Sequence, residues 1–444
     1  MSAGFLALFE DAFAPRFAPV ALTRSVAGLR LGAWTHRERW EHLFPERSML
    51  LVCRESVAAR ERALEPWEAV NDVPPADVLF VAAALGRAGA DVVAAIRALE
   101  SGGALVAEGR IVAARASGEA AGRLGAALRE AIGASAGAAG SSSAGTAGAA
   151  HAGDGPRLLA GAGLRSQDVP VAWPRTLVDL IRANEDALRE DVQAYRGLLR
   201  SVDAAAHPHA RFVRPERVHV AEGVRVDAGA VLDASEGPIL LGPGSRIMAN
   251  AVVTGPVAIG RDGRVKPLGR VSATSLGPVC RVGGEVDGCI LLGFSNKQHD
   301  GFLGHSYLGA WVNLGAATDT SDLKNDYGPV RVTLGGETID TGDMHVGSLI
   351  GDHTKTAIHT RLNTGTVLGV CCNVLGADFP PKSVPSFTWG GDGAWSEYRI
   401  DKAMEVARVV MARRDTPLSP EDEALLRALH RASEPERRAF LAGA

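Results

Sequence analysis

The feature of this sequence that most constrains its fold is a six-residue period in the second half of the chain. Aliphatic residues stand six positions apart at Leu241, Ile247, Val253, Ile259, Val265 and Val271. Since 46% of the chain is hydrophobic, six hits in one frame would arise by chance only about once in a hundred trials. The period therefore favours a fold in which every sixth side chain returns to one core.

Two later frames repeat the period with polar interruptions. They run through Ile290, Asn296, Phe302, Leu308, Leu314 and Thr320, and through Met344, Ile350, Thr356, Leu362, Leu368 and Val374. Glycines such as Gly260 and Gly369 follow several of these positions and suit a repeated tight corner. Such hexads are typical of a parallel β-helix, whereas strands of a β-sandwich recur about every 8–12 residues. We expect a three-sided prism over 211–390, with 321–332 as a projecting loop.

The first 172 residues have another pattern. Short apolar runs, such as 5–9 and 78–84, alternate with helical patches such as 89–99, which indicates an α/β domain. Within this domain the stretch 115–157 is rich in alanine, glycine and serine. Such a composition buries little apolar surface, so we expect a disordered insert there.

Helical patterns flank the predicted prism. Residues 173–210 are predicted to form a bridging helix, Arg175 to Tyr195, and a connector. The final segment, 391–444, is predicted to hold helices that could cap the β-helix. The first runs from Ile400 to Arg414, and the second begins after a Ser419 N-cap.

Charge, cysteine content and hydropathy exclude several classes of protein. The 444-residue chain has 47 basic and 51 acidic residues, a net charge of −4, so we expect no nucleic-acid partner. No apolar stretch reaches the roughly 18 residues of a membrane span, and Glu10 and Asp11 come too early for a signal peptide. Five cysteines without regular spacing favour a reducing, cytoplasmic setting.

Two motifs resemble a known family. The run SNKQHDGFLGHSYLG at 295–309, continued by WVNLGA at 311–316, resembles the acetyltransferase half of GlmU-type bifunctional enzymes. In those enzymes a sugar-phosphate nucleotidyltransferase domain is joined to a left-handed β-helix. The runs LTRSVAGLRLG at 22–32 and THRERW at 35–40 resemble a GlmU-like family with a shortened first domain.

The resemblance implies a left-handed β-helix, a homotrimer with acyl sites between subunits, and three small-molecule partners. These partners are a sugar 1-phosphate, a nucleoside triphosphate and acetyl-CoA or another acyl-CoA. The chain departs from the family at Ser25, where proline is usual, and at Gly28, where an acidic residue is usual. It also lacks the glycine-rich phosphate loop of ordinary nucleotidyltransferases.

Acyl transfer needs a base of near-neutral pKa and a donor for the oxyanion. In GlmU enzymes the base is a histidine three residues before a Tyr-Leu-Gly triplet, and here His305 lies two before Tyr307. We therefore expect His305 to be the base, with His299 as the other candidate. Asn313 is expected to position the substrate or the developing charge.

Phosphate groups would be held by cations. In the β-helix the expected contacts are Lys297 and Lys324, together with Arg270 or Arg281. The resemblance adds Tyr307 and the turn that begins at Asn325 to the substrate site.

In the first domain the expected phosphate contacts are Arg24 and Arg30. Asn71 and Asp72 are candidate ligands for the Mg²⁺ that an active nucleotidyltransferase domain would need.

A zinc site is the alternative interpretation of the histidines, because some left-handed β-helices hold zinc between histidines. His299 and His305 are six residues apart, and so are His353 and His359. Six residues lead to the next face of a three-sided prism, so neither pair shares a face, and the pattern disfavours zinc.

Three functions therefore stay open. The first is a GlmU-like transferase with nucleotidyl and acyl transfer on separate domains. The second is an acyltransferase with a degenerate N-terminal domain. The third is a trimeric scaffold that binds a sugar nucleotide without catalysis.

Overall fold

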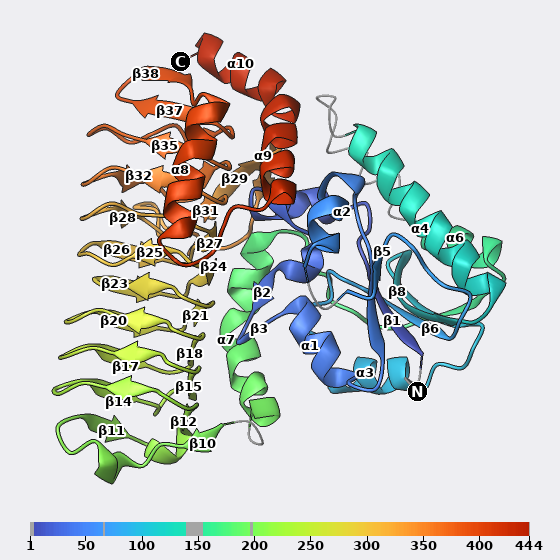
Figure 1. Ribbon diagram of the computed structural model, residues 1–444, viewed down its shortest axis with the longest axis horizontal. Helices are drawn as coiled ribbons and strands as arrows, with labels where there is room; N and C mark the ends of the chain where they lie inside the picture. Colours follow the sequence, from blue (N-terminus) through green and yellow to red (C-terminus); the bar gives the residue numbers. More distant parts are fainter. Residues whose placement is uncertain (1–3, 65–66, 139–153, 196–198, 444) are drawn as a thin grey trace.

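The computed structural model describes residues 4–64, 67–138, 154–195 and 199–443. An N-terminal α/β domain is followed by a long helix, a tall three-sided β-helix and C-terminal helices (Figure 1). The long helix, α7 (Leu177–Tyr195), runs between the β-helix and the N-terminal domain. The predicted fold class, an α/β domain joined to a left-handed β-helix of hexapeptide repeats with C-terminal helices, is confirmed.

A seven-stranded mixed sheet forms the centre of the N-terminal domain, in the order β5-β4-β1-β6-β8-β7-β9. Its strands are β1 (Phe5–Phe9), β4 (Ser48–Val52), β5 (Ala69–Val70), β6 (Val78–Ala82), β7 (Gly103–Ala107), β8 (Arg110–Ala116) and β9 (Arg165–Asp168). The helices around it are α1 (His36–Leu43), α2 (Glu55–Arg62), α3 (Ala90–Arg97), α4 (Glu119–Ala138) and α6 (Gly155–Gly161). Strand β1 is central and pairs in parallel with β4 and β6. Its continuous apolar sequence fits a strand covered on both faces.

The prediction of a disordered insert over 115–157 is wrong for residues 119–138, which form α4. Alanine is the strongest helix former, and apolar residues recur along this helix near helical spacing. Those buried in the domain core are Ala121, Leu124, Leu128 and Ile132. Composition hid this periodicity because alanine and glycine separate the larger residues. Residues 139–153 of the predicted insert lie outside the described part of the chain.

The β-helix has three faces, each a stack of short parallel strands. The docking face is formed by β12 (Val218–Val220), β15 (Ile239–Leu241), β18 (Val257–Ile259), β21 (Ser275–Leu276), β24 (Ile290–Gly293), β27 (Tyr307–Ala310), β31 (Leu349–Ile350), β34 (Val367–Leu368) and β36 (Ser383–Val384). An antiparallel strand, β10 (Arg200–Ser201), starts this stack.

The outer face is formed by β11 (Arg211–Val213), β14 (Val231–Asp233), β17 (Val252–Thr254), β20 (Arg270–Ser272), β23 (Glu285–Asp287), β26 (Phe302–Gly304), β28 (Asp319–Thr320) and β33 (Arg361–Leu362). The arginine face is formed by β13 (Arg225–Val226), β16 (Arg246–Ile247), β19 (Arg264–Val265), β22 (Arg281–Val282), β25 (Asn296–Lys297), β32 (Lys355–Thr356), β35 (Asn373–Val374) and β37 (Thr388–Gly391). Single bridges of Asn313 to Asn296 and to Lys355 connect the two halves of this face. An antiparallel strand, β38 (Ala394–Glu397), ends it.

The six-residue period places one aliphatic side chain per face in the prism core. All six residues of the first frame are at most 2% exposed and belong to one apolar cluster. Leu241 pairs with Ile259 and Ile247 with Val265, one coil apart on the same face. Each fully buried aliphatic side chain contributes roughly 1.5–3 kcal/mol of transfer free energy. The inward column is therefore the main source of stability along the β-helix.

The second frame is wrong by one residue at its start. Leu276 pairs with Leu291, fifteen positions later, because this coil has shorter corners than three full hexads. The inward residues are consequently Leu291, Lys297 and Leu303 rather than 290, 296 and 302. The third frame holds from Ile350 onward, but its first residue, Met344, is exposed.

Lys297 occupies an inward position that a hydrophobic residue would normally fill. It stacks on Val282, is 0% exposed, and donates hydrogen bonds from Nζ to the carbonyls of His299 (2.7 Å) and Asp300 (2.9 Å). Burial lowers the pKa of Lys297 to about 8. Within this chain the side chain is therefore placed to bind corner carbonyls, not the phosphate for which it was predicted.

The docking face is covered by α7 and the N-terminal domain. Its outward residues Ile290, Tyr307 and Val367 belong to the same apolar cluster as the core of that domain. Asn184 of α7 joins the parts, because its Oδ1 accepts hydrogen bonds from Gly32 N (2.9 Å) and from Ser275 Oγ (2.8 Å). The two domains thus share one continuous core.

The C-terminal helices are α8 (Ile400–Ala412), α9 (Pro420–Ala432) and α10 (Glu434–Gly443). The predicted N-cap is confirmed, since Ser419 Oγ accepts a hydrogen bond from Asp422 N at 3.0 Å. Helix α10 packs on β38, where the Trp395 and Phe440 rings lie 5.5 Å apart. Helices α8 and α9 instead run back beside the β-helix toward the N-terminal domain (Figure 1). None of the helices in the described ranges has an apolar stretch that could serve as a membrane span.

Replacing Lys297 with methionine tests the buried charge. Because the folded-state pKa lies below the ordinary value of 10.5, the folded protein binds this proton less readily than the unfolded chain. Wild-type stability should therefore rise with pH from about 8 to 10.5 relative to Lys297→Met. We expect the variant to melt at or above the wild-type temperature at pH 7 and to lose this advantage by pH 10.

Thermal unfolding at the two pH values measures the difference. Val282→Met, at the inward position one coil earlier, controls for the change in bulk without a charge. A difference in melting temperature between wild type and Lys297→Met that is the same at both pH values would contradict the assignment.

Candidate active site

The candidate active site lies at the corner between the outer face and the docking face. His305 connects β26 to β27 there and has a left-handed backbone conformation, with φ of 39°. In the coil before it stands Gly288, where an added Cβ would come within 2.8 Å of the His305 ring. A glycine below the histidine thus leaves room for the imidazole at this corner.

An insert between β28 and β31 supplies the partners of His305. It contains the hairpin β29 (Arg331–Leu334) and β30 (Glu337–Asp340). A bridge between Leu323 and His345 closes its base, next to His305. The insert does not project freely as predicted, because its residues Val330, Val332 and Leu334 are buried in the core shared with the N-terminal domain.

His305 and Asp322 form a hydrogen-bonded pair. His305 Nδ1 lies 2.7 Å from Asp322 Oδ2, and the His305 side chain remains 31% exposed. An ionised carboxylate only accepts hydrogen bonds, so Nδ1 must carry the proton. The lone pair is then on Nε2, the nitrogen that would act as a base.

Charges around His305 tune its basicity. Burial by itself would lower the pKa of His305, but the hydrogen bond to Asp322 and the charges of Asp322, Asp287 and Asp343 raise it above the ordinary value. The imidazole is thus a stronger base than a free histidine. That property suits removal of a proton from an amine or hydroxyl.

His345 also lies near, with its ring centroid 5.2 Å from that of His305. Ligand atoms of His305, Asp322 and His345 lie within 4.8 Å of one another, which makes them the metal-compatible group among the described residues. Two tetrahedral ligands at the roughly 2.0–2.1 Å of a zinc bond would be separated by about 3.3 Å. The 2.7 Å between His305 and Asp322 is instead the length of a hydrogen bond, so the arrangement is that of a hydrogen-bonded pair.

The other residues predicted for the acyl site lie elsewhere in the chain. His299 is exposed at a different corner, where its carbonyl accepts from Lys297. Asn313 lies on the arginine face, and its Oδ1 accepts from Asn296 Nδ2 at 3.3 Å. Within one chain, the docking-face strand β27 separates Asn313 from His305.

Lys324 and Asn325 lie in the insert that carries Asp322. Lys324 Nζ is 3.1 Å from Asp326 Oδ1, and Asn325 is exposed. Burial and the charge of Lys324 lower the pKa of Lys382, so these two lysines lie near each other. Of the predicted phosphate contacts in the β-helix, Arg270 instead pairs with Glu285.

Arg24, Arg30 and Tyr307, all predicted to bind substrate, form the contact between the domains. The Arg24 guanidinium pairs with Asp352, whose Oδ2 also accepts from Thr23 Oγ1 at 2.9 Å. Tyr307 Oη accepts from Arg30 N (2.8 Å) and donates to Arg30 O (3.0 Å), and its side chain is 0% exposed. The Arg24 guanidinium, the Tyr307 side chain and the Arg30 backbone therefore dock the N-terminal domain, whereas the Arg30 guanidinium donates to the carbonyl of Ala33 within that domain.

The crevice where α/β sheets usually bind ligands is occupied by the chain itself. Glu10 follows the central strand β1 and is 1% exposed. Its carboxylate accepts from Val26 N (2.8 Å), Arg54 N (2.9 Å) and the Arg54 guanidinium, which in turn donates to the carbonyls of Ala21 and Arg24. Residues 20–29 are thereby tied across the carboxyl ends of the strands, the usual site for a nucleotide.

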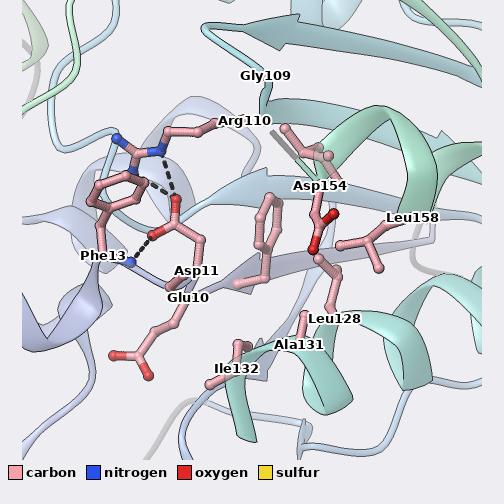
Figure 2. A pocket seen from close by; sticks show the side chains of 14 residues that line it. Glu10, Asp11, Phe13, Gly109, Arg110, Leu128, Ala131, Ile132, Asp154 and Leu158 are labelled. Atoms are coloured by element: carbon pink, nitrogen blue, oxygen red, sulfur yellow. Dashed lines mark hydrogen bonds and ion pairs between the residues drawn. The ribbon is translucent and has the colours of Figure 1, made fainter. Parts of the chain in front are cut away.

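A small cavity beside this crevice is shown in Figure 2. Its volume is about 50 Å³, room for a few waters at most. Asp11 accepts from Arg110 Nε (2.8 Å) and from Phe13 N (3.0 Å), and the Arg110 guanidinium stacks on Phe13. Asp11 and Arg110, which line this cavity, therefore form an ion pair with each other.

The residues at the crevice do not fit a Mg²⁺ ion. Glu10 is saturated by Arg54 and two backbone amides, and Asp11 pairs with Arg110. Of the predicted ligands, Asn71 uses its Oδ1 to accept from Cys53 N at 2.8 Å, and Asp72 is exposed at the edge of the sheet.

Sequence reasoning missed Asp322 and His345. One signal was present, because Asp322 follows His305 by seventeen residues, the same spacing that pairs Leu291 with Leu308 in neighbouring coils. Residues one coil apart stack on each other, so the spacing alone would have predicted this contact.

Asp322→Asn tests the dyad. Removing the negative charge should lower the pKa of His305, because its favourable interaction with the imidazolium is lost. An NMR titration of the histidine ring protons measures the change. Asp326→Asn, an exposed acidic residue in the same insert, is the matched control and should leave His305 unchanged. Equal titration curves for Asp322→Asn and wild type would show that the pair does not set the basicity.

Comparison with known proteins finds one family model and several similar curated proteins. Residues 6–197 match the model of a family described as sugar nucleotidyl transferase. The bifunctional protein GlmU of Azoarcus sp. (strain BH72) is 28% identical over 183 residues, 36% of each chain. A bifunctional sugar-1-phosphate nucleotidylyltransferase/acetyltransferase of Sulfurisphaera tokodaii is 29% identical over 90 residues, 20% of this chain and 22% of the relative.

A solved structure of a mutant of AntD, an N-acyltransferase from Bacillus cereus, covers 48% of this chain and 98% of its own at 12% identity. Its TM-score of 0.20 is too low to support an argument. The matches to the first two relatives span about a third or less of the relatives' own length. Residues 6–197 therefore resemble the sugar nucleotidyl transferase family, and the chain is GlmU-like in joining such a domain to a β-helix.

Proposed function

We propose that this protein transfers an acyl group from an acyl-CoA to an amine or hydroxyl of a sugar phosphate, with His305 as the general base. The observation that carries the proposal is the 2.7 Å hydrogen bond between His305 Nδ1 and Asp322 Oδ2 beside a partly exposed ring. The S. tokodaii relative, named a sugar-1-phosphate nucleotidylyltransferase/acetyltransferase, supports the substrate class.

The reaction requires one base and one acid. Nε2 of His305 removes a proton from the sugar nucleophile as that atom attacks the thioester carbonyl. The carbon–sulfur bond then breaks, and the protonated His305 returns its proton to the departing CoA thiolate. Asp322 holds the ring in the reactive tautomer and stabilises the imidazolium, which makes it a positioning residue.

The geometry favours acyl transfer alone over a bifunctional enzyme. Residues 20–29 and Arg54 fill the crevice that a nucleoside triphosphate would enter. The Arg24 guanidinium is paired with Asp352 between the domains, and the Arg30 guanidinium donates to the carbonyl of Ala33 and lies 3.8 Å from Glu38. We propose that the N-terminal domain is a structural partner of the β-helix, and that a homotrimer completes the acyl site, as the family resemblance implies.

Activity of single-site variants tests the base. Purified protein is incubated with acetyl-CoA and glucosamine 1-phosphate, and free thiol is measured. His305→Ala should reduce kcat/KM by about 10²- to 10⁴-fold, the usual contribution of a general base, whereas His299→Ala should keep activity. The rate should fall as the pH drops through the raised pKa of His305, because the base must be neutral.

Three results would contradict parts of this proposal. Full activity of His305→Ala would contradict the assignment of His305 as the general base. Pyrophosphate release from UTP or dTTP with Mg²⁺ would revive the bifunctional interpretation, and the absence of both products would leave the scaffold interpretation.

A further inference from the structure

The arginine face carries a column of positive charge that the acyl-transfer site does not use. Arg225, Arg246, Arg264 and Arg281 stand at the same outward position in four successive coils, in register. Arg246 is neutralised by Asp227, with Nη2 2.8 Å from Oδ2. Ion pairs within the described residues include neither Arg264 nor Arg281. Arg264 and Arg281, the last two residues of the column, therefore keep their positive charges without a neutralising partner in the described residues.

The end of α8 adds two more arginines to the same place. Arg414 Nη2 donates to Asn296 Oδ1 at 3.1 Å, and Asn296 is the outward residue stacked directly on Arg281. Partial burial and the charges of Arg413 and Arg264 lower the pKa of Arg414. Four guanidinium groups from two separate elements, Arg264, Arg281, Arg413 and Arg414, thus gather at one site, called here the arginine cluster.

Like charges held this close oppose folding. Partial burial and the charges of Arg414, Arg264 and Arg413 lower the pKa of Arg281. In addition, Nε of Arg281 is buried without a hydrogen-bond partner, so a donor is left unsatisfied. The cluster is therefore a cost to the isolated chain.

The packing around the arginine cluster does not require these four positive charges. The coils are held by the inward Val265 and Val282, both 0% exposed. Helix α8 is held by Met411, which packs with Ala310 and Trp311. Neutral residues at the four arginine positions would leave both contacts intact, so the charge points to a ligand.

We propose that the arginine cluster binds the phosphate groups of a phosphorylated small molecule. Planar guanidinium groups match phosphate oxygens in pairs, and several of them together suit a diphosphate or two nearby phosphates. Asn296, fixed between Arg414 and Asn313, orients one guanidinium before the ligand arrives. The site lies on a different face from His305 and does not depend on the acyl-transfer proposal.

Calorimetric titration of the full chain with inorganic pyrophosphate at low salt tests the site. We expect saturable binding that weakens as salt is added. The double variant Arg264→Gln/Arg281→Gln should bind about 10- to 100-fold more weakly, because two charge-assisted contacts are lost. Arg246→Gln is the matched control, since it lies in the same column but pairs with Asp227, and it should bind like wild type.

A thermal-shift measurement on the same proteins separates loss of binding from loss of folding. Pyrophosphate should raise the melting temperature of wild type and Arg246→Gln but not of the double variant. Without ligand the double variant should melt no lower than wild type, because repulsion has been removed. Titrations with UDP and with adenosine 3′,5′-bisphosphate then show which arrangement of phosphates fits best.

Absence of binding by all three anions would overturn the proposal. So would equal weakening by Arg246→Gln and by the double variant, because that would indicate a diffuse effect of surface charge rather than a site.

Discussion

Stacking of equivalent residues in successive coils is the constraint on which the rest of this structure depends. Parallel strands one coil apart pair in register, so each outward or inward position becomes a column. An inward column must be apolar, because it fills a narrow prism, and the chain obeys this rule except at Lys297 and at small polar residues such as Thr320. Outward columns are free to differ, and each face here has its own chemistry.

The apolar outward column explains why the two domains form one body. Ile290, Tyr307 and Val367 continue the hydrophobic core of the N-terminal domain, and the buried pair of Arg24 and Asp352 fixes the register between them. Removing one partner of a buried ion pair is strongly destabilising, because the other charge is left buried and uncompensated. The segment that makes this contact also fills the entrance of the nucleotide crevice, so the arrangement closes that crevice to a ligand.

The candidate active-site residues lie at corners of the β-helix, because side chains at corners do not have to fill the apolar core. His305 has a backbone conformation that a strand would not allow, and the insert that replaces the next corner brings Asp322 within 2.7 Å of it. The pair forms only because the chain leaves the coil after Thr320 and re-enters it near Gly347, whose N–H bonds to His305 O at 2.9 Å.

Much of the architecture could be predicted from the sequence, because one residue in six fixes the β-helix. Some coils are shorter than three hexads, as between Leu276 and Leu291. Counting in steps of six therefore misplaced the inward residues there and predicted a surface position for Lys297. His305 was identified by its motif, but its partner Asp322 depends on coil length. The roles of Arg24 and Tyr307 depend on the contact between distant segments, which periodicity within one segment does not specify.

Thiol accessibility tests the column arrangement most directly. All five native cysteines are buried, so the folded protein should give no rapid reaction with a thiol reagent. Arg264→Cys should add one fast-reacting thiol per chain, whereas Val265→Cys, at the adjacent inward position that is 0% exposed, should react only after unfolding. Rapid labelling of Val265→Cys in the folded protein, or protection of both variants, would contradict the alternation of inward and outward residues.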